Sequence, residues 1–380
     1  DMTPCLYRCA WFVTNMPEMW NKTAMTAEVH GVLAHHLTGE WVTSTASADP
    51  MGLIDMAKMD WSDRLLAAVG LTRSQLPRLF RPGEKMGGVT REASAATGLP
   101  EGLPVVAGGG DGQCAGTGVD VFAKGRAYVN LGTAVVSGAY GKAYVHDPVF
   151  RTLTAMGEDG YIYESCIRTG AFIIDWMVEK LFNIELSQGR GILRTLEQEA
   201  AASPVGANGI AVVPYWSGSM TPYWDKDARG VIAGVTASHR RGDVYRAVME
   251  GIALEQTMMT DKIAAVTQPI DHYVAMGGGA SSDLWCQILA DASGREVRRS
   301  TTVEASALGA AVAAAAGAGW YGSVSKAAHA MAGALAKTFT PDRKAHEQYR
   351  RLLAIYVDLW PALSDWNKRI AAFAQGDIHG

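Results

Sequence analysis

Two spacings of apolar residues follow one another along the chain. Short uninterrupted apolar runs are typical of buried strands, and apolar residues three and four positions apart are typical of helices with one buried face. The runs that predict strands are 104–107, 126–131, 210–214 and 273–276. The stretches that predict helices in the same part of the chain are 171–181, 243–259, 281–292, 305–318 and one or two within 344–374. Strands that alternate with helices predict an α/β architecture.

The first hundred residues contain two further predicted helices and a candidate linker. Residues 24–38 and 62–69 have helical spacing, and each is followed by a glycine, which commonly ends a helix. Ser62 can cap the second of these helices. The segment Gly98–Pro104 contains two glycines and two prolines, the strongest linker signal in the chain. A boundary at this segment predicts two domains: 1–103 and 104–380.

Glycine-rich turns follow three of the predicted strands, at Gly108–Asp111, Gly132–Thr133 and Gly277–Ala280. Glycine lets backbone amides come close to an anion, and the last turn opens a helix, whose N-terminus attracts negative charge. Three such turns predict one polyanionic ligand that several loops bind together. Asp111 stands at the tip of the first turn, where a carboxylate can serve as the base that activates a hydroxyl for phosphoryl transfer.

Each of these turns also has a purely structural interpretation. A solvated Asp111 after a flexible turn and a β-hairpin at Gly132–Thr133 need no ligand. The chain has no GxxxxGK[ST] loop, which argues against a Walker-type nucleotide site. Gly110–Ala115 matches the loose GxGxxA pattern of dinucleotide-binding proteins. The next strand, however, lacks the acidic residue at its end that a dinucleotide-binding fold requires.

Composition and charge argue against several classes of function. The chain has 380 residues, of which 48% are hydrophobic and 19% charged, as in globular proteins. The net charge of -4 predicts no nucleic-acid partner and no anionic membrane partner. The apolar run 305–319 is too short to span a bilayer. The five scattered cysteines predict free thiols, so we expect a cytoplasmic protein.

Several histidine and aromatic residues are weaker candidates. His30, His35 and His36 lie on or near one predicted helix, but neighbouring positions point to different sides of a helix. We therefore expect solvated or helix-end histidines and no protein-bound metal. Aromatic residues that could stack on a sugar are Trp216, Tyr223 and Trp224. The tryptophans that we expect in the packed interior are Trp176, Trp285 and Trp320.

Five segments in a fixed order resemble the FGGY carbohydrate kinases, a family that includes xylulokinases and glycerol kinases. They are GGGDGQCAG (108–116), VNLGT (129–133), the stretch from PYWSG to EGIA (214–253), MGGGASSDLWCQILADASGREV (276–297) and EASALGAAVAAAAGAGWYG (304–322). The spacing G-x-I-x-G-V…D-V-x-x-A-V-M-E from Gly230 to Glu250 is the most specific of these signals. The similarity extends from about Thr26 to about Tyr356.

The resemblance implies a two-lobed actin/hexokinase-type fold, ribonuclease H-like, with the active site between the lobes. It implies ATP and Mg²⁺ as cofactors, a sugar as the second substrate, and it allows a homodimer. Asp111 takes the position of the family's catalytic base. The residues that take the positions of nucleotide-contacting residues are Gly132, Thr133, Gly170, Ala171, Gly278, Gly279, Ala280 and Asp283. The residues that would contact the sugar are Asp111, Gly112 and Gln113.

The chain departs from the family pattern in three places. The family opens with an Asp-x-Gly-Thr turn that residues 1–103 do not contain, so we expect an incomplete first lobe. Xylulokinases continue after the base with Asn, where this chain has Gly112 and Gln113. The segment PYWDKDARG is closer to glycerol kinases. A pentulose such as xylulose is the expected substrate. The alternatives are glycerol or another polyol, an inactive fragment or regulatory member, and a nicotinamide-dependent dehydrogenase.

Overall fold

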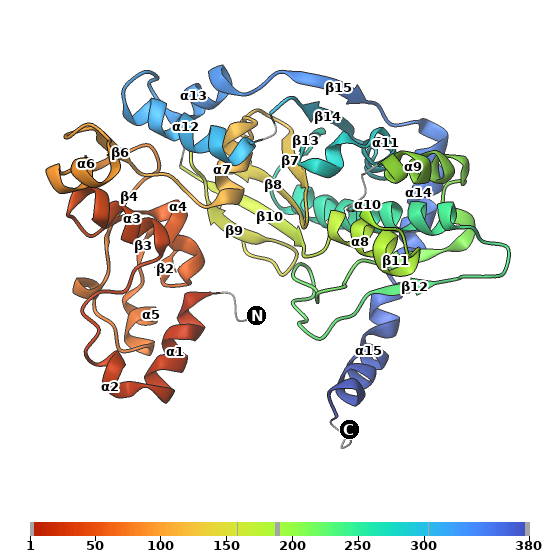
Figure 1. Ribbon diagram of the computed structural model, residues 1–380, viewed down its shortest axis with the longest axis horizontal. Helices are drawn as coiled ribbons and strands as arrows, with labels where there is room; N and C mark the ends of the chain where they lie inside the picture. The colour runs from red at the N-terminus through yellow and green to blue at the C-terminus, as the bar shows by residue number, and fades with distance from the viewer. Residues whose placement is uncertain (1–3, 158, 187–190, 303, 377–380) are drawn as a thin grey trace.

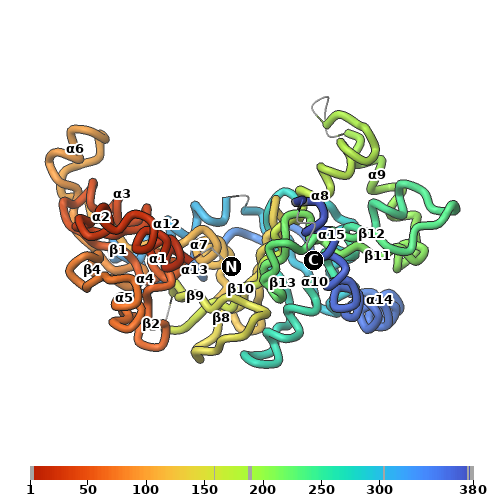
Figure 2. The backbone as a smooth tube through the Cα atoms, turned by 90° about the horizontal axis from the view of Figure 1, so that it is seen from below, coloured from red at the N-terminus to blue at the C-terminus, as the bar shows by residue number. Residues whose placement is uncertain are grey.

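The computed structural model describes residues 4–157, 159–186, 191–302 and 304–376. The described chain has two parts (Figure 1). The N-terminal part comprises the elements up to β6 and gathers at one side of the molecule. The C-terminal part, from α7 to α15, is built around one large sheet. A view from below separates the same two parts and places α9, β11, β12 and α14 far from the N-terminal elements (Figure 2).

The N-terminal part consists of short helices and two-stranded sheets. Its helices are α1 (Cys5–Asn15), α2 (Pro17–Trp20), α3 (Val29–Thr38), α4 (Thr45–Ala48), the 3-10 turn η1 (Asp49–Met51), α5 (Asp63–Ala68), the 3-10 turn η2 (Arg73–Gln75) and α6 (Arg91–Thr97). Its strands are β1 (Val42–Ser44), β2 (Ile54–Asp55), β3 (Asp60–Trp61), β4 (Arg78–Phe80), β5 (Lys85–Gly88) and β6 (Pro104–Val106). One core surrounds Trp20, Leu53 and Trp61, and a second surrounds Val42 and Met86.

A seven-stranded mixed sheet organises the C-terminal part, in the order β15-β14-β13-β7-β8-β10-β9. The neighbouring strands β14, β13 and β7 run parallel, and the remaining pairs are antiparallel. The strands of this part are β7 (Arg126–Leu131), β8 (Val135–Gly141), β9 (Arg151–Thr154), β10 (Tyr161–Ile167), β11 (Ala211–Val213), β12 (Val231–Ala233), β13 (His272–Met276), β14 (Glu296–Ser300) and β15 (Leu335–Phe339). β11 and β12 form a separate pair.

Helices cover both faces of this sheet. They are α7 (Asp111–Gly118), α8 (Ala171–Trp176) with the π-helical turn η3 (Met177–Leu181), α9 (Gly191–Ala202), the 3-10 turn η5 (Ala207–Gly209), α10 (Arg241–Val266), the 3-10 turn η6 (Gly278–Ser281), α11 (Asp283–Ser293), α12 (Ala305–Gly317), α13 (Val324–Met331), α14 (Arg343–Tyr356) and α15 (Leu359–Gln375). Alternate residues of β7 face opposite sides. Val129 and Leu131 belong to the core that contains α10 and α11 residues, and Tyr128 belongs to the core that contains α7 residues.

Most of the predicted elements are confirmed. β7 has the predicted bounds, Ser62 caps α5 by accepting from the Leu65 amide, and the predicted terminal helices are α14 and α15. α10 is longer than predicted, with 26 residues. Within the described residues, no helix combines the length and apolar composition needed to cross a membrane.

One prediction for the N-terminal part was wrong in detail. α3 begins at Val29 and not at residue 24, because the Glu28 side chain accepts hydrogen bonds from the amides of His30 and Gly31 and so caps the helix there. The candidate linker Gly98–Pro104 connects α6 to β6, and β6 pairs with β5. This segment therefore joins elements that pack against each other, and the domain boundary at residue 104 stays a prediction.

The close packing of α7 on α12 can be tested by adding a methyl group between the two helices. A Cβ at Gly309 would overlap the backbone carbonyl of Cys114, so Gly309→Ala forces the two helices apart. We expect the variant to lose about 1–3 kcal/mol of unfolding free energy, the usual cost of overpacking. Chemical denaturation measures this loss. Gly322→Ala is the control, because its nearest neighbour lies at 3.7 Å. Equal stability of both variants would contradict the packing described here.

Candidate active site

Asp111 is the first residue of α7 and follows the turn Gly108–Gly110. The Gly110 amide donates to the Ala46 carbonyl (3.1 Å), which attaches this turn to the N-terminal part. The Asp111 side chain is exposed, and its Oδ1 accepts from the Gly112 amide (2.9 Å). The Ser306 hydroxyl at the start of α12 donates to the Asp111 carbonyl (3.0 Å). The backbone of Asp111 is thus held from two sides, while its carboxylate remains accessible.

Glycines bring α7 close to both of its neighbours. A Cβ at Gly112 would collide with the Glu164 carboxylate on β10, and a Cβ at Gly116 would lie 2.8 Å from the Tyr128 ring on β7. On another side of the helix, a Cβ at Gly118 would overlap the Ala305 carbonyl of α12. Because any side chain at these positions would push the helix outward, the glycines determine where Asp111 lies.

Gln113 is buried and its side chain points into the protein. Its Nε2 donates to the Ala46 carbonyl (2.9 Å) and lies 3.3 and 3.4 Å from the two carboxylate oxygens of Asp49. Asp49 in turn accepts from the Thr154 amide on β9 (2.6 Å). This junction connects the N-terminal part to both α7 and the sheet.

The turn Gly132–Thr133 joins β7 to β8 as a hairpin, with Leu131 opposite Val135. The backbone of the turn is attached to the start of α8. The Gly170 amide donates to the Thr133 carbonyl (2.6 Å), and the Ala171 amide donates to the Gly132 carbonyl (2.8 Å). The turn is therefore a β-hairpin, as its structural interpretation predicts. The Thr133 side chain is exposed and can still bind a ligand.

The turn Gly277–Ala280 lies against the end of β7. Gly277 has a φ of 84°, which favours glycine, and a Cβ at Gly279 would lie 2.7 Å from the Leu131 carbonyl and 2.6 Å from the Trp285 ring. Ala280 is buried in the core. Gly278 differs from these residues, because no heavy atom lies within 4 Å of its ideal Cβ. Gly278 is thus the residue of this turn that faces open space.

Asp283 begins α11 and forms two ion pairs, with Lys337 (2.5 Å) and Arg299 (2.7 Å). The hydrogen bonds from Lys337 and Arg299 hold the pKa of the Asp283 carboxyl below its ordinary value. The carboxylate is exposed, and its charge is already balanced within the protein.

The predicted nucleotide residues converge on the end of β7. The Gly132–Thr133 turn, the Gly170–Ala171 backbone and the Gly277–Gly279 turn all contact that strand end or its hairpin. The C-terminus of α7 lies at the start of β7, where Arg126 donates to the Val119 and Asp120 carbonyls, and the first turn of α7 lies over Glu164 in the middle of β10.

Trp320 behaves differently from the sequence-based expectation. It is 78% exposed, so its assignment to the packed interior was wrong, whereas Trp285 is buried as expected. Trp320 lines an apolar groove of about 630 Å³ beside α12. His30 lies in the first turn of α3, a helix-end position as expected, and it is half-buried, with its ring 3.1 Å from the Thr43 hydroxyl and 3.4 Å from the Gly108 amide. The contact with Thr43 on β1 was not predicted.

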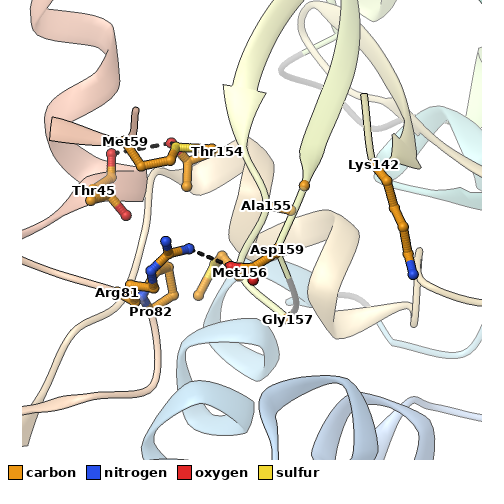
Figure 3. Close-up of a pocket in the computed structure, with 11 residues that line it drawn as sticks. Thr45, Met59, Arg81, Pro82, Lys142, Thr154, Ala155, Met156, Gly157 and Asp159 are labelled. Carbon is orange, nitrogen blue, oxygen red and sulfur yellow. Dashed lines mark hydrogen bonds and ion pairs between the residues drawn. The ribbon is translucent and has the colours of Figure 1, made fainter. Parts of the chain in front are cut away.

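A separate cavity of about 470 Å³ lies at the turn between β9 and β10 (Figure 3). Thr45, Met59 and Arg81 approach it from the N-terminal part, and Arg81 pairs with Asp159 across it (2.5 Å). None of the predicted site residues lines this cavity. Within the described residues, no group of three or more His, Cys, Asp or Glu side chains could hold a metal ion.

Two family models match the chain. The model of the C-terminal domain of the FGGY family of carbohydrate kinases matches residues 127–318. The model of the N-terminal domain of the same family matches residues 1–118. Together the two matches account for most of the chain.

Xylulose kinases are among the similar curated proteins. The xylulose kinase of Bacillus subtilis is 26% identical over 370 residues, which are 97% of this chain and 73% of that protein. The xylulose kinase of Escherichia coli is 31% identical over 291 residues, 76% of this chain and 58% of that protein. A ligand-bound xylulose kinase from Lactobacillus acidophilus superimposes with a TM-score of 0.90 at 21% identity, covering 97% of this chain and 74% of that one. The predicted two-lobed α/β fold is confirmed.

The buried Asp49 makes stability depend on pH. Burial raises the pKa of its carboxyl to about 7, although the Thr154 hydrogen bond acts in the opposite direction. The pKa of an unfolded Asp is about 3.9. The folded state therefore loses stability as pH rises from about 4 through about 7, because the charged form is disfavoured inside. Asp49→Asn cannot ionise, so relative to wild type it should gain about 3 kcal/mol between pH 5 and pH 8.

Denaturation curves at several pH values measure this difference. Glu101→Gln, a change at an exposed turn residue, is the control and should follow the wild-type pH dependence. If Asp49→Asn also runs parallel to wild type from pH 5 to pH 8, the carboxyl does not titrate in this range and the assignment is wrong.

Proposed function

Because this chain belongs to the FGGY family of carbohydrate kinases, which phosphorylate sugars with ATP, we propose that its substrate is a pentulose such as xylulose and that Asp111 is the general base. The observation that carries the proposal is the position of Asp111: an accessible carboxylate at the start of a helix that its glycines hold tightly against the sheet and α12. The xylulose kinases among the relatives support the choice of a pentulose.

The proposed reaction needs little covalent chemistry from the protein. The Asp111 carboxylate accepts the proton of the sugar hydroxyl as that oxygen attacks the γ-phosphorus of ATP in line and ADP leaves. Catalysis then depends mainly on holding the two substrates in place. Gly112 lets the first turn of α7 rest on Glu164 beside the base, and the buried Gln113 acts on the sugar indirectly, by attaching α7 to Ala46.

The nucleotide is proposed to lie along the converging turns. Thr133 offers an exposed hydroxyl and Gly278 faces open space, while Gly132 and Gly170 are proposed to shape this surface by holding the hairpin turn against the start of α8. The residues proposed to complete this surface through their backbone or their position are Ala171, Gly279, Ala280 and Asp283. Mg²⁺ usually binds through one or two carboxylates together with substrate phosphates. The described residues contain no group of three or more His, Cys, Asp or Glu side chains that could hold it alone, so we propose that the ion enters with ATP.

A polyol such as glycerol is the second candidate substrate, because PYWDKDARG departs from the xylulokinase pattern toward that of glycerol kinases. Cytoplasmic location and a homodimer stay predictions. A panel of xylulose, ribulose, gluconate and glycerol, assayed with the full-length protein by ADP release, separates the substrates. The largest kcat/KM with xylulose or ribulose is the expected result, and a larger value with glycerol would favour the second candidate.

The base is tested by Asp111→Asn, which keeps the shape of the side chain but cannot accept the proton. We expect kcat to fall by about 10²–10⁴, the usual contribution of a positioned base. The KM for ATP should change little, because the ground-state contacts of the nucleotide remain. Wild-type turnover in this variant would show that another group removes the proton.

The nucleotide assignment is tested at Gly278. Since Gly278 has free space around its Cβ position, Gly278→Val should fold as well as wild type and still obstruct ATP. We expect the KM for ATP to rise at least about tenfold, equivalent to about 1.4 kcal/mol, with an unchanged KM for the sugar. Gly279→Val is the comparison: it collides with Trp285 and should lower stability as well. An unchanged KM for ATP in Gly278→Val would contradict the assignment.

A further inference from the structure

Four residues form a continuous row across the sheet beneath α7. Tyr128 on β7 lies opposite Gly138 on β8, and Gly138 lies opposite Glu164 on β10. Arg151 on β9 lies opposite Glu164 and completes the row. Residues that lie opposite each other on neighbouring strands point to the same face. The row therefore crosses the face that α7 covers.

The side chains of this row bind one another. The Tyr128 hydroxyl donates to Glu164 Oε2 (2.8 Å), and Arg151 Nη2 forms an ion pair with Glu164 Oε1. Gly138 makes the first contact possible, since a Cβ there would lie 2.8 Å from the Tyr128 hydroxyl. Glu164 is only 1% exposed, so its charge is balanced by Arg151 and not by water.

The protonation states of the two partners of Glu164 suit this arrangement. Burial raises the pKa of Tyr128 well above its ordinary value, so its hydroxyl stays a hydrogen-bond donor. Burial alone would lower the pKa of Arg151, but the adjacent Glu164 charge raises it overall. Glu164 thus lies between one lasting hydrogen-bond donor and one lasting cation.

Glu164 lies directly beneath the first turn of α7. Gly112 touches its carboxylate so closely that no side chain fits between them, and Gly116 lies on the Tyr128 ring one helical turn later. The first turn of a helix exposes amides with partial positive charge, which a carboxylate stabilises. The residue that Glu164 supports is the immediate neighbour of Asp111.

We propose that the Arg151–Glu164 ion pair positions Asp111 and controls the charge around it. Glu164 supports residue 112 and so directs the Asp111 carboxylate, and Arg151 cancels the Glu164 charge that would otherwise oppose ionisation of Asp111. This inference rests on the proposed function, in which Asp111 is the base. Glu164 and Arg151 are positioning residues, because they act on the reaction through α7.

The remaining ionisable groups near this turn can be separated from the pair. Burial raises the pKa of Cys114 on α7 and of Cys166 on β10 to about 11, which keeps both thiols neutral during an assay. Asp49 on η1 interacts with both members of the pair, and burial raises its pKa to about 7. The pH profiles are therefore measured in the wild-type and Asp49→Asn backgrounds. α12 contributes the uncharged Ser306 to this region.

The test uses single variants that remove opposite charges. In the full-length enzyme, kcat/KM is measured against pH with ATP and xylulose. Glu164→Gln leaves the Arg151 charge unbalanced, which favours ionised Asp111. The acidic limb of the profile, where kcat/KM rises with pH, should therefore move about one pH unit lower. Arg151→Met leaves the Glu164 charge unbalanced, so the limb should move about one unit higher. Misplacement of the base should also lower kcat about 10- to 100-fold in Glu164→Gln, with little change in the KM for ATP.

Two further variants keep the test valid if Arg151→Met folds poorly. Arg151→Lys keeps the positive charge and should restore the wild-type limb. The double variant Glu164→Gln with Arg151→Met removes both charges and should also return the limb close to the wild-type position, with a reduced kcat.

The protein contains a matched control triad outside the site. Tyr349 donates to Glu250 (2.7 Å), and Arg246 pairs with Glu250 (2.7 Å), all three being buried. Glu250→Gln removes a comparable buried charge and should lower stability without moving the acidic limb.

The outcomes distinguish this inference from the proposed function. Shifts in opposite directions that cancel in the double variant support the pair as the positioning device. If Asp111→Asn is inactive but the limb stays fixed, moves the same way in both single variants, or moves equally in Glu250→Gln, the inference is overturned and the base assignment stands. Wild-type turnover in Asp111→Asn overturns both.

Discussion

The close approach of α7 to its surroundings is the constraint on which the candidate site depends. Gly112 and Gly116 let the helix rest on the sheet, and Gly118 together with Gly309 lets it rest on α12. Glycine is a weak helix former, so an eight-residue segment with three internal glycines gains little from intrinsic propensity. Tertiary packing therefore holds the helix in place, and with it the direction of the Asp111 carboxylate.

Strands followed by glycine turns were the most predictable part of the structure. β7 and the long helices follow from uninterrupted apolar runs and helical spacing, because these elements are buried along their length. The convergence of Gly132 and Gly277 on one strand end also follows from sequence, since parallel β7 and β13 end at the same side of the sheet. What remained a prediction is the chemistry of these turns.

Features that depend on contacts between distant segments could not be predicted. Gln113 is adjacent to the exposed Asp111 and Gly112 in sequence, yet its amide is bound by Ala46 and Asp49. Gly279 and Gly278 look equivalent in the motif, but only the first is enclosed by Trp285. The row that contains Glu164 crosses four strands, and the alternation of Glu164 with apolar neighbours gives no sign that its charge is paired.

The junction at Asp49 has a mechanical consequence. Its carboxylate is bound by β9 and by α7, so the N-terminal part is attached to the sheet at a point next to the base. A rotation of the two parts about this junction would displace elements that lie farther from it, such as α6, through long arcs (Figures 1 and 2). Asp111, close to the axis, would move least. Such a rotation would open the space between the two parts to substrates while the Asp111 carboxylate keeps its orientation.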